Sequence, residues 1–152
     1  MIIKITNLPV GIHFLNFEKT AKQLQLGEPF VDNVYLDCTL DKAQHQILLN
    51  CNLTIFADLI CDRCSSEFKE KLQANFSLLF LYDRKNIDIV HDNLNYISPN
   101  ADKIDLTEDI IDYSKLSIPM KKLCSEDCKG LCIKCGINLN EKKCNCEDNE
   151  DN

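Results

Sequence analysis

Most cysteines of this chain lie in close pairs, and this spacing constrains the fold more than any other feature of the sequence. The chain has ten cysteines in 152 residues. Thiolates separated by a short turn can bind one ion at about 2.3 Å, and two such turns complete a tetrahedral site. Disulfides are rare in a reducing cytosol, so the spacing favours metal ligation, with redox chemistry second. The pairs are Cys61/Cys64, Cys124/Cys128, Cys132/Cys135 and Cys144/Cys146.

The two most C-terminal pairs predict a complete zinc site. Cys132 and Cys135 are followed by Gly136, which permits the left-handed backbone that a zinc knuckle needs. The last pair comes after a short connection, and closing a short loop costs little entropy. We therefore predict that one structural Zn²⁺ is held by Cys132, Cys135, Cys144 and Cys146.

Two arrangements are open for the remaining pairs, and the sequence does not distinguish them. In one, a second metal site forms from Cys61, Cys64, Cys124 and Cys128. In the other, the 61/64 pair joins the 132/135 pair in a two-knuckle zinc ribbon. Because a four-thiolate site has no open coordination position, either metal would be structural rather than catalytic.

A thiol-disulfide redox protein that uses Cys61 and Cys64 is the main rival. This pair lies between two predicted strands, not at the start of a helix that would lower a thiol pKa. The three histidines are isolated, and the chain has no HExxH, P-loop, GxGxxG or GxSxG motif. We therefore expect no enzyme activity and no small-molecule substrate. A generic zinc-ribbon adaptor that binds a protein partner is a third option.

Alternating apolar residues predict three strands, at 34–40, 47–57 and 68–80. Their short connections predict an antiparallel β-meander or partial barrel, with the 61/64 pair near a hairpin tip. Cys38 and Cys51 fall on the apolar faces, where we expect them to pack as small apolar side chains.

Two short helices are predicted beside these strands. The first, near 18–26, follows the spacing of Phe14, Phe17, Ala21 and Leu24. The second, at 105–116, has Asp105 as its predicted N-cap, a buried stripe that Leu116 extends, and a proline after its end.

The predicted fold class is α+β, divided into three parts. An α+β core domain covers 1–119 and includes the hairpin cysteines. A Cys-rich zinc-binding segment covers 120–146, and the acidic tail 147–152 is expected to be disordered. Residues 83–103 are expected to form a loop. The chain has no apolar run of membrane-spanning length and no signal-peptide core, which predicts a cytoplasmic protein.

Charge separates the C-terminal segment from the rest of the chain. The net charge is −7, from 17 Lys and Arg against 24 Asp and Glu, the wrong sign for a protein that coats itself in nucleic acid. Residues 115–146 nevertheless carry seven lysines against three acidic residues. These lysines either offset zinc-bound thiolates or contact phosphate or a partner. The candidate contact residues are Lys121, Lys122, Lys129, Lys142 and Lys143.

Three motifs together resemble the YceD family of large ribosomal RNA subunit accumulation proteins. They are the run from Leu116 to Cys146 with its six cysteines, the helix start at 104–108, and the Cys61-Asp-Arg-Cys64 pair followed by Phe68. The resemblance implies a bacterial, cytoplasmic, non-enzymatic factor for 23S ribosomal RNA processing or accumulation in large-subunit assembly. Its implied partner is pre-ribosomal large-subunit RNA or a ribosomal protein.

Overall fold

The computed structural model describes residues 1–82 and 94–146, which form two compact units. Unit 1 comprises residues 1–57 and 71–118, and unit 2 comprises 58–70 together with the chain from 119 onward. The hairpin cysteines, predicted as part of a 1–119 domain, are therefore grouped with the C-terminal segment. The predicted disordered tail, 147–152, and residues 83–93 of the predicted loop lie outside the described residues.

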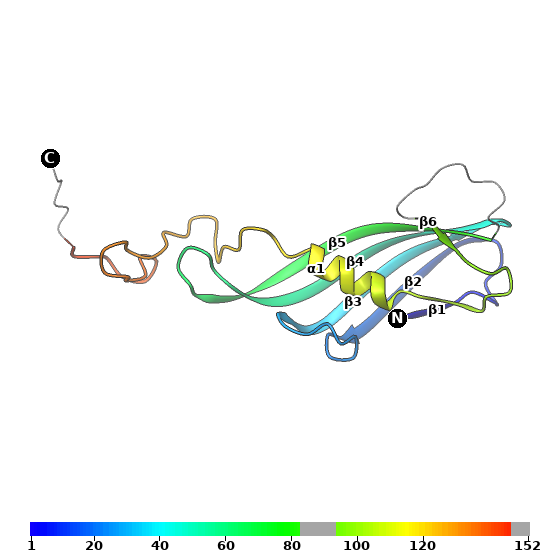
Figure 1. The fold of residues 1–152 in the computed structure, drawn as a ribbon, viewed down its shortest axis with the longest axis horizontal. Coiled ribbons are helices and arrows are strands. Elements are labelled where there is room, and N and C mark those ends of the chain that lie inside the picture. The colour runs from blue at the N-terminus through cyan, green and yellow to red at the C-terminus, as the bar shows by residue number, and fades with distance from the viewer. Residues whose placement is uncertain (83–93, 147–152) are drawn as a thin grey trace. The chain divides into compact units, whose positions relative to one another are not determined.

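A five-stranded sheet forms most of the regular structure (Figure 1). β2 pairs antiparallel with β3, and β3 with β4. The short connection 61–66 between β4 and β5 allows only an antiparallel hairpin, so the predicted meander is confirmed. The sheet is open, however, and does not close toward a barrel. Its strands in spatial order are β2 (Gly11–Thr20), β3 (Phe30–Lys42), β4 (Gln46–Ile60), β5 (Glu67–Leu81) and β6 (Leu94–Tyr96).

Within the predicted loop 83–103 the structure has a strand that periodicity did not reveal. This strand, β6, pairs parallel with β5. A second sheet pairs β1 (Ile2–Lys4) antiparallel with β7 (Lys103–Asp105). Strands of three residues are too short to show a period of two, so the sequence pattern misses them.

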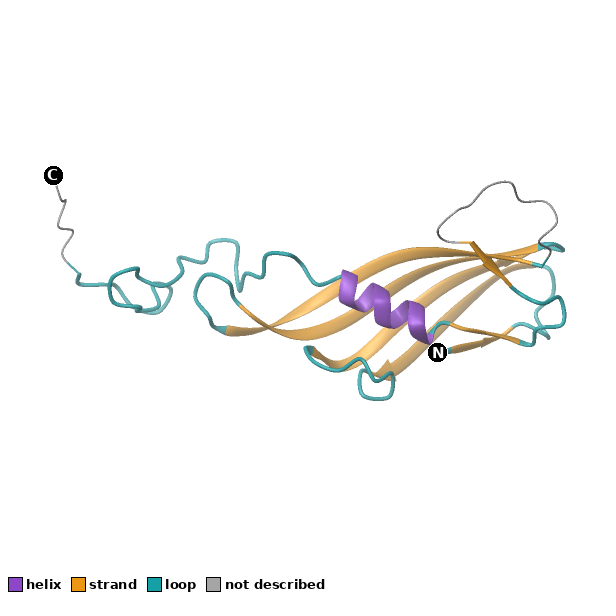
Figure 2. Ribbon diagram, viewed as in Figure 1, coloured by secondary structure: helices purple, strands orange, loops and turns teal. Residues whose placement is uncertain are grey.

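One face of the large sheet forms the core of unit 1. Successive apolar residues of β3 and β4 are almost fully buried because every second side chain points to the same face. The helix α1 (Thr107–Leu116) lies across this face (Figure 2). Its Ile110 is fully buried, and Tyr113 stacks on Phe76 of β5 with 4.2 Å between ring centroids. The sheet residues of this core include Val34, Leu36, Leu40, Leu49, Leu53 and Ile55.

The helix predicted near 18–26 was wrong. β2 continues to Thr20, and residues 21–25 form a turn. The spacing of the four apolar residues matches one face of a helix only by coincidence. Phe14 belongs to a strand, and its side chain is 78% exposed. Ten consecutive cross-strand pairs with β3 decide the conformation of β2, and only Ala21 and Leu24 of the predicted stripe are fully buried.

The second predicted helix is confirmed, with changes at both ends. It begins at Thr107, and its N-cap residue is Leu106, whose side chain forms no capping hydrogen bond. Leu116 does not extend the buried stripe but is 76% exposed.

The described part of the chain has no helix long and apolar enough to span a membrane.

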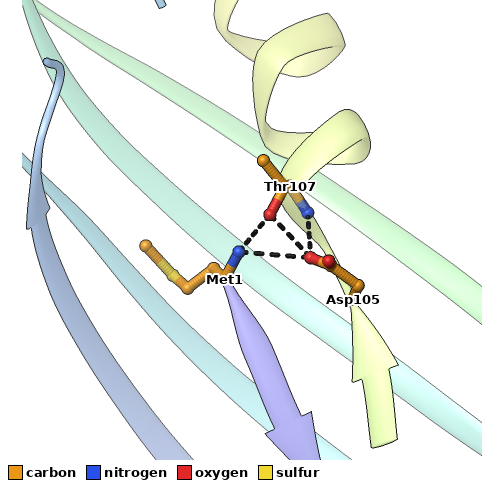
Figure 3. Close-up of polar contacts among 3 residues, drawn as sticks. All are labelled: Met1, Asp105 and Thr107. Carbon is orange, nitrogen blue, oxygen red and sulfur yellow. Dashed lines mark hydrogen bonds and ion pairs between the residues drawn. The ribbon is translucent and has the colours of Figure 1, made fainter. Parts of the chain in front are cut away.

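Asp105, predicted as the helix N-cap, is the last residue of β7, and its carboxylate accepts hydrogen bonds from three donors (Figure 3). Its carboxylate accepts hydrogen bonds from the Thr107 backbone N–H at 3.0 Å, from the Thr107 hydroxyl at 2.6 Å and from the Met1 ammonium at 3.3 Å. The Met1 ammonium also contacts the Thr107 hydroxyl. The hydrogen bonds from Thr107, followed by the Met1 charge, lower the pKa of Asp105 below its usual value.

The substitution Asp105→Ala is expected to lower the free energy of unfolding of unit 1 by about 1 kcal/mol at pH 7, because the side chain is exposed and its bonds are screened by solvent. A lowered folded-state pKa stabilises the fold above the unfolded-state pKa, and this contribution is lost as pH falls through the folded-state value. The difference between variant and wild type should therefore vanish toward low pH in denaturant titrations.

Asp109→Asn is the matched control for this experiment. Burial raises the pKa of Asp109, so its ionised form does not favour folding. We expect this variant to be as stable as wild type at pH 7, or more so. A loss equal to that of Asp105→Ala would contradict our account of Asp105.

Cys38 and Cys51 are packed on the buried face as predicted, but they also form a disulfide, which the sequence did not predict. Both are buried, at 3% and 2% exposure. They face each other across β3 and β4 with 4.2 Å between their Cα atoms. The alternation pattern showed the face on which each cysteine lies but not the register that places them opposite each other.

Candidate metal centres

Backbone hydrogen bonds hold the hairpin connection against the C-terminal segment inside unit 2. The N–H of Asp62 donates to the carbonyl of Lys122 at 2.8 Å, and the N–H of Leu131 donates to the carbonyl of Arg63 at 3.1 Å. The Arg63 guanidinium donates to the carbonyl of Cys128 at 2.9 Å. These bonds join residues far apart in the sequence, so the cysteines of both segments meet.

The inner cluster consists of Cys61, Cys64, Cys124 and Cys128. Their four Sγ atoms all lie within 4.8 Å of one another. The Cys61 and Cys128 sulfurs are 3.7 Å apart, and those of Cys64 and Cys124 are 3.6 Å apart. A tetrahedral ion with sulfur ligands at ~2.3 Å would place its ligands about 3.8 Å apart. The inner cluster therefore has dimensions that can hold a metal ion.

The outer cluster consists of Cys132, Cys135, Cys144 and Cys146, whose Sγ atoms also lie within 4.8 Å of one another. Sγ of Cys144 is 3.3 Å from that of Cys132 and 3.5 Å from that of Cys135. The first two cysteines flank a tight turn in which the N–H of Gly136 donates to the carbonyl of Cys132 at 2.8 Å. Gly136 has φ = 73°, the left-handed conformation expected of a knuckle.

The structure thus brings together the two sets of four that the sequence suggested. The alternative grouping, with the 61/64 pair joined to the 132/135 pair, is not the arrangement observed. The two clusters differ in burial. Three sulfurs of the inner cluster belong to buried residues, with Phe68 and Leu123 packed against them, whereas no cysteine of the outer cluster is fully buried.

The electrostatics of the inner cluster favour one thiolate and oppose full deprotonation. Burial tends to raise the pKa of Cys61, but hydrogen bonds from the backbone N–H groups of Cys124, Cys64 and Arg63 outweigh it and lower this pKa to about 6. The neighbouring Cys64 sulfur, followed by burial, raises the pKa of Cys124 to about 12. A cation among the sulfurs would remove this conflict because it stabilises all four thiolates.

The outer cluster has the same electrostatic pattern. Backbone N–H groups of Cys135 and Lys134 lower the pKa of Cys132 to about 6. The adjacent Cys144 sulfur raises the pKa of Cys146 to about 12. In both clusters, therefore, backbone N–H groups lower the pKa of one cysteine, and the neighbouring sulfurs raise the pKa of another. A cation between the sulfurs would stabilise all of the thiolates.

Two asparagines that sequence reasoning did not identify support the clusters. The Asn140 amide donates to Sγ of Cys128 at 3.3 Å, and its carbonyl oxygen accepts the N–H of Lys129 at 2.8 Å. The Asn138 amide donates to the Ser66 hydroxyl at 3.3 Å, which links the two segments of unit 2. Nothing in their spacing distinguishes these asparagines from ordinary turn residues.

The five candidate contact lysines all belong to unit 2, but their surroundings are not basic. Lys122 lies 3.8 Å from the Asp62 carboxylate, while the other four are exposed. Residues 58–70 and 119–146 together contain eight Lys and Arg against seven Asp and Glu, a net charge of +1. The hairpin thus supplies acidic residues that offset the lysines of the C-terminal segment.

Gly130 offers a test of how closely the two segments of unit 2 must approach. Its φ is 76°, and a Cβ there would lie 3.1 Å from the Arg63 carbonyl oxygen. Gly130→Ala should therefore combine a left-handed strain of about 1–2 kcal/mol with displacement of the hairpin. Gly136→Ala is the control, because its φ of 73° imposes similar strain but a Cβ there meets nothing within 4 Å. We expect only Gly130→Ala to increase proteolysis of both segments; equal susceptibility would contradict the close approach.

Comparisons with known proteins show what this chain is similar to. The family model described as "Large ribosomal RNA subunit accumulation protein YceD" matches residues 49–152, which include both clusters. "Large ribosomal RNA subunit accumulation protein YCED homolog 1, chloroplastic" of Arabidopsis thaliana is 30% identical over 113 residues, covering 57% of this chain and 35% of the relative.

Mycobacterial proteins are also similar to this chain. An uncharacterized protein of Mycobacterium leprae is 26% identical over 108 residues, which cover 70% of this chain and 49% of that protein. One from Mycobacterium tuberculosis is 33% identical over 79 residues, covering 52% of this chain and 38% of that protein. The chain thus spans half or less of the curated relatives it matches, and no solved structure matches it. The family match extends over most of the chain, from within β4 onward, and the chain therefore belongs to the YceD family of large ribosomal RNA subunit accumulation proteins.

Proposed function

We propose that this protein is a non-enzymatic factor that supports 23S ribosomal RNA processing and accumulation during large-subunit assembly, in the cytoplasm of a bacterial cell. Two structural zinc ions hold unit 2 in its binding conformation. The observation that carries this proposal is the pair of four-sulfur clusters in a chain whose family is described by large-subunit RNA accumulation.

Zinc is the proposed metal because of the donor set. Four thiolates in tetrahedral array suit zinc or iron–sulfur chemistry, and sulfurs within 4.8 Å of one another fit a single ion. Zinc supplies folding free energy to a segment poor in apolar residues, on the order of 10–16 kcal/mol in small zinc domains. Four protein ligands leave no position for a substrate, which supports a structural role.

A redox function of Cys61 and Cys64 is the weaker alternative. The low pKa of Cys61 would suit a reactive thiol. The side chains of Cys61 and Cys64 are, however, only 1% and 4% exposed, and two further sulfurs lie beside them. A disulfide partner would have no access to a thiol buried in this way.

A protein partner fits the charge of unit 2 better than a large RNA footprint. Each zinc with four thiolates carries a net charge of −2, so two such sites change the net charge of residues 58–70 and 119–146 from +1 to −3. Phosphate contacts are then limited to a few exposed lysines. An RNA affinity that falls steeply with salt, with a log–log slope of about −0.7 per phosphate contacted, would favour RNA instead.

Co-sedimentation with ribosomal particles tests the proposed function. We expect wild-type protein in a lysate to migrate with large-subunit precursors, and its depletion to reduce 23S ribosomal RNA relative to 16S. Variants that lose a cluster should leave these particles. Protein that stays at the top of the gradient, with unchanged 23S ribosomal RNA after depletion, would overturn the proposal.

Chelator titration is expected to release the two ions at different rates. Protein purified without chelator should contain about two zinc ions per chain. The outer cluster, whose cysteines are half-buried or exposed, should lose its ion first, and the inner cluster should retain its ion much longer. Chromogenic chelators give the time course, and a single phase that releases both ions would contradict the difference in burial.

A further inference from the structure

A second surface, in unit 1 and separate from the cysteine clusters, has the features of a binding face. β2 is the edge strand of the five-stranded sheet, and within residues 1–82 and 94–146 it pairs with β3 alone. On the face opposite α1, residues of these two strands form a surface that we call the edge face. It comprises Ile12, Phe14 and Glu18 of β2 and Tyr35, Asp37 and Asp41 of β3.

Large apolar side chains are exposed on the edge face. Phe14 is 78% exposed, Ile12 is 62% exposed and Tyr35 is 39% exposed. The register places Ile12 opposite Asp41, and Glu18 opposite Tyr35. Asp41 and Glu18 therefore each lie beside an exposed apolar or aromatic side chain, and such mixed surfaces are typical of protein-binding sites.

The charge of the edge face is negative. Of the residues of β2 and β3 that point to this face, three are carboxylates and none is Lys or Arg. Asp37 accepts a hydrogen bond from the Asn16 amide at 2.5 Å, and Glu18 accepts one from the Asn33 amide at 2.6 Å. Amides are neutral, so these two bonds orient the Asp37 and Glu18 carboxylates without placing a cation beside them.

A hollow of about 510 Å³ opens on the edge face. Glu18 and Asp37 line it with the aromatic rings of Tyr35 and Phe56, and Lys71 is the one cation among its lining residues. Two carboxylates against one lysine leave the hollow negative. Aromatic rings beside carboxylates suit a lysine or arginine side chain, which can form an ion pair and a cation–π contact.

Among the described residues no strand pairs with the outer edge of β2, and this edge indicates the shape of the occupant. Leu15 and Phe17, on the other face of β2, are only half-buried although apolar. An added strand would pair with the outer backbone groups of β2 and cover both side chains. Its side chains would alternate between Leu15 and Phe17 on one face and the carboxylates on the other.

We propose that the edge face of unit 1 binds an extended, positively charged polypeptide segment of a partner protein, which adds to β2 as a further strand. Lysine or arginine side chains of this segment lie against Glu18, Asp37 and Asp41. Its apolar side chains cover Leu15 and Phe17. This surface shares no residue with the cysteine clusters, so its failure and the failure of the proposed function are distinguishable.

The test uses the full-length protein and a fluorescent ten-residue peptide of alternating lysine and valine. Fluorescence anisotropy should show saturable binding that weakens with salt. The double variant Glu18→Gln/Asp37→Asn should weaken it about tenfold. Phe14→Ser, at a position exposed enough to tolerate serine, should also weaken binding. A peptide with a central proline should bind less well because proline removes a backbone donor.

A charge-matched variant distinguishes binding at the edge face from nonspecific attraction of the peptide to a protein of net charge −7. Glu108→Gln/Asp112→Asn removes two exposed carboxylates from α1 and should leave the affinity unchanged. Equal weakening by both double variants would overturn the proposal. It would also be overturned if a short uridine-rich RNA competed for the same face, or if Phe14→Ser converted a dimer of this chain into a monomer. An unaltered zinc content in all variants confirms that the metal sites are not involved.

Discussion

Cys128→Ser is expected to remove one metal ion per chain and to unfold residues 119–131, which precede the outer cluster. Cys128 is buried at 3% exposure, its sulfur lies 3.7 Å from that of Cys61, and its carbonyl accepts the Arg63 guanidinium. A hydroxyl is a poor zinc ligand, and the remaining three sulfurs would be left in a site prepared for a cation. Loss of the ion removes folding free energy of about 10 kcal/mol or more.

Cys132→Ser is the matched variant in the outer cluster. It should also lose one ion, but the hydrogen bonds between Arg63, Leu131 and Cys128 should persist because they involve the inner cluster. Metal analysis gives the stoichiometry, and hydrogen exchange locates the unfolded segment. Cys51→Ser, which removes no cluster ligand, should leave the zinc content unchanged. If Cys128→Ser retained both ions with normal protection, the inner cluster would not be a metal site.

Ile110→Ala is expected to lower the free energy of unfolding of unit 1 by about 2–5 kcal/mol. Ile110 is fully buried where α1 covers the sheet, so truncation loses apolar contact and leaves a cavity. In a protein of this size about 3 kcal/mol corresponds to a fall in Tm of roughly 6–12 °C. Thermal unfolding followed by near-ultraviolet circular dichroism, which reports the packing of Tyr113 on Phe76, measures it.

Leu116→Ala is the control from the same helix. Leu116 is 76% exposed, so its truncation should change the stability by less than about 0.5 kcal/mol. The sequence assigned both residues to one buried stripe, and the structure separates them. If both variants were equally destabilised, the end of α1 would be covered in solution.

Sequence periodicity predicted the parts of the fold that depend on long alternating patterns. The strands around Leu36, Leu53 and Leu78 were found because their apolar faces are buried and a period of two repeats several times. β1 and β7 were missed because they are short. Their pairing, as of Ile3 with Ile104, joins residues about a hundred positions apart, which no local pattern indicates.

Cysteine spacing showed which residues pair locally, but not which pairs share a site. Both candidate partners of the 61/64 pair have suitable spacing, and long-range backbone bonds such as that between Arg63 and Leu131 decide between them. The disulfide of Cys38 and Cys51 was missed for a related reason, since the cross-strand register depends on tertiary pairing. The edge face was not predicted because the spacing of Phe14 and Phe17 in β2 also fits one face of a helix.

The positions of the inner-cluster cysteines in the sequence also constrain when all four could bind one ion during synthesis. Cys64 precedes Cys124 by 60 residues. At typical elongation rates of 5–20 residues per second, roughly 3–12 s pass before the nascent chain supplies the second half of the ligand set. During that interval the hairpin thiols are incomplete as a binding site. A metal ion bound by all four cysteines of the inner cluster would therefore report that translation has passed residue 128.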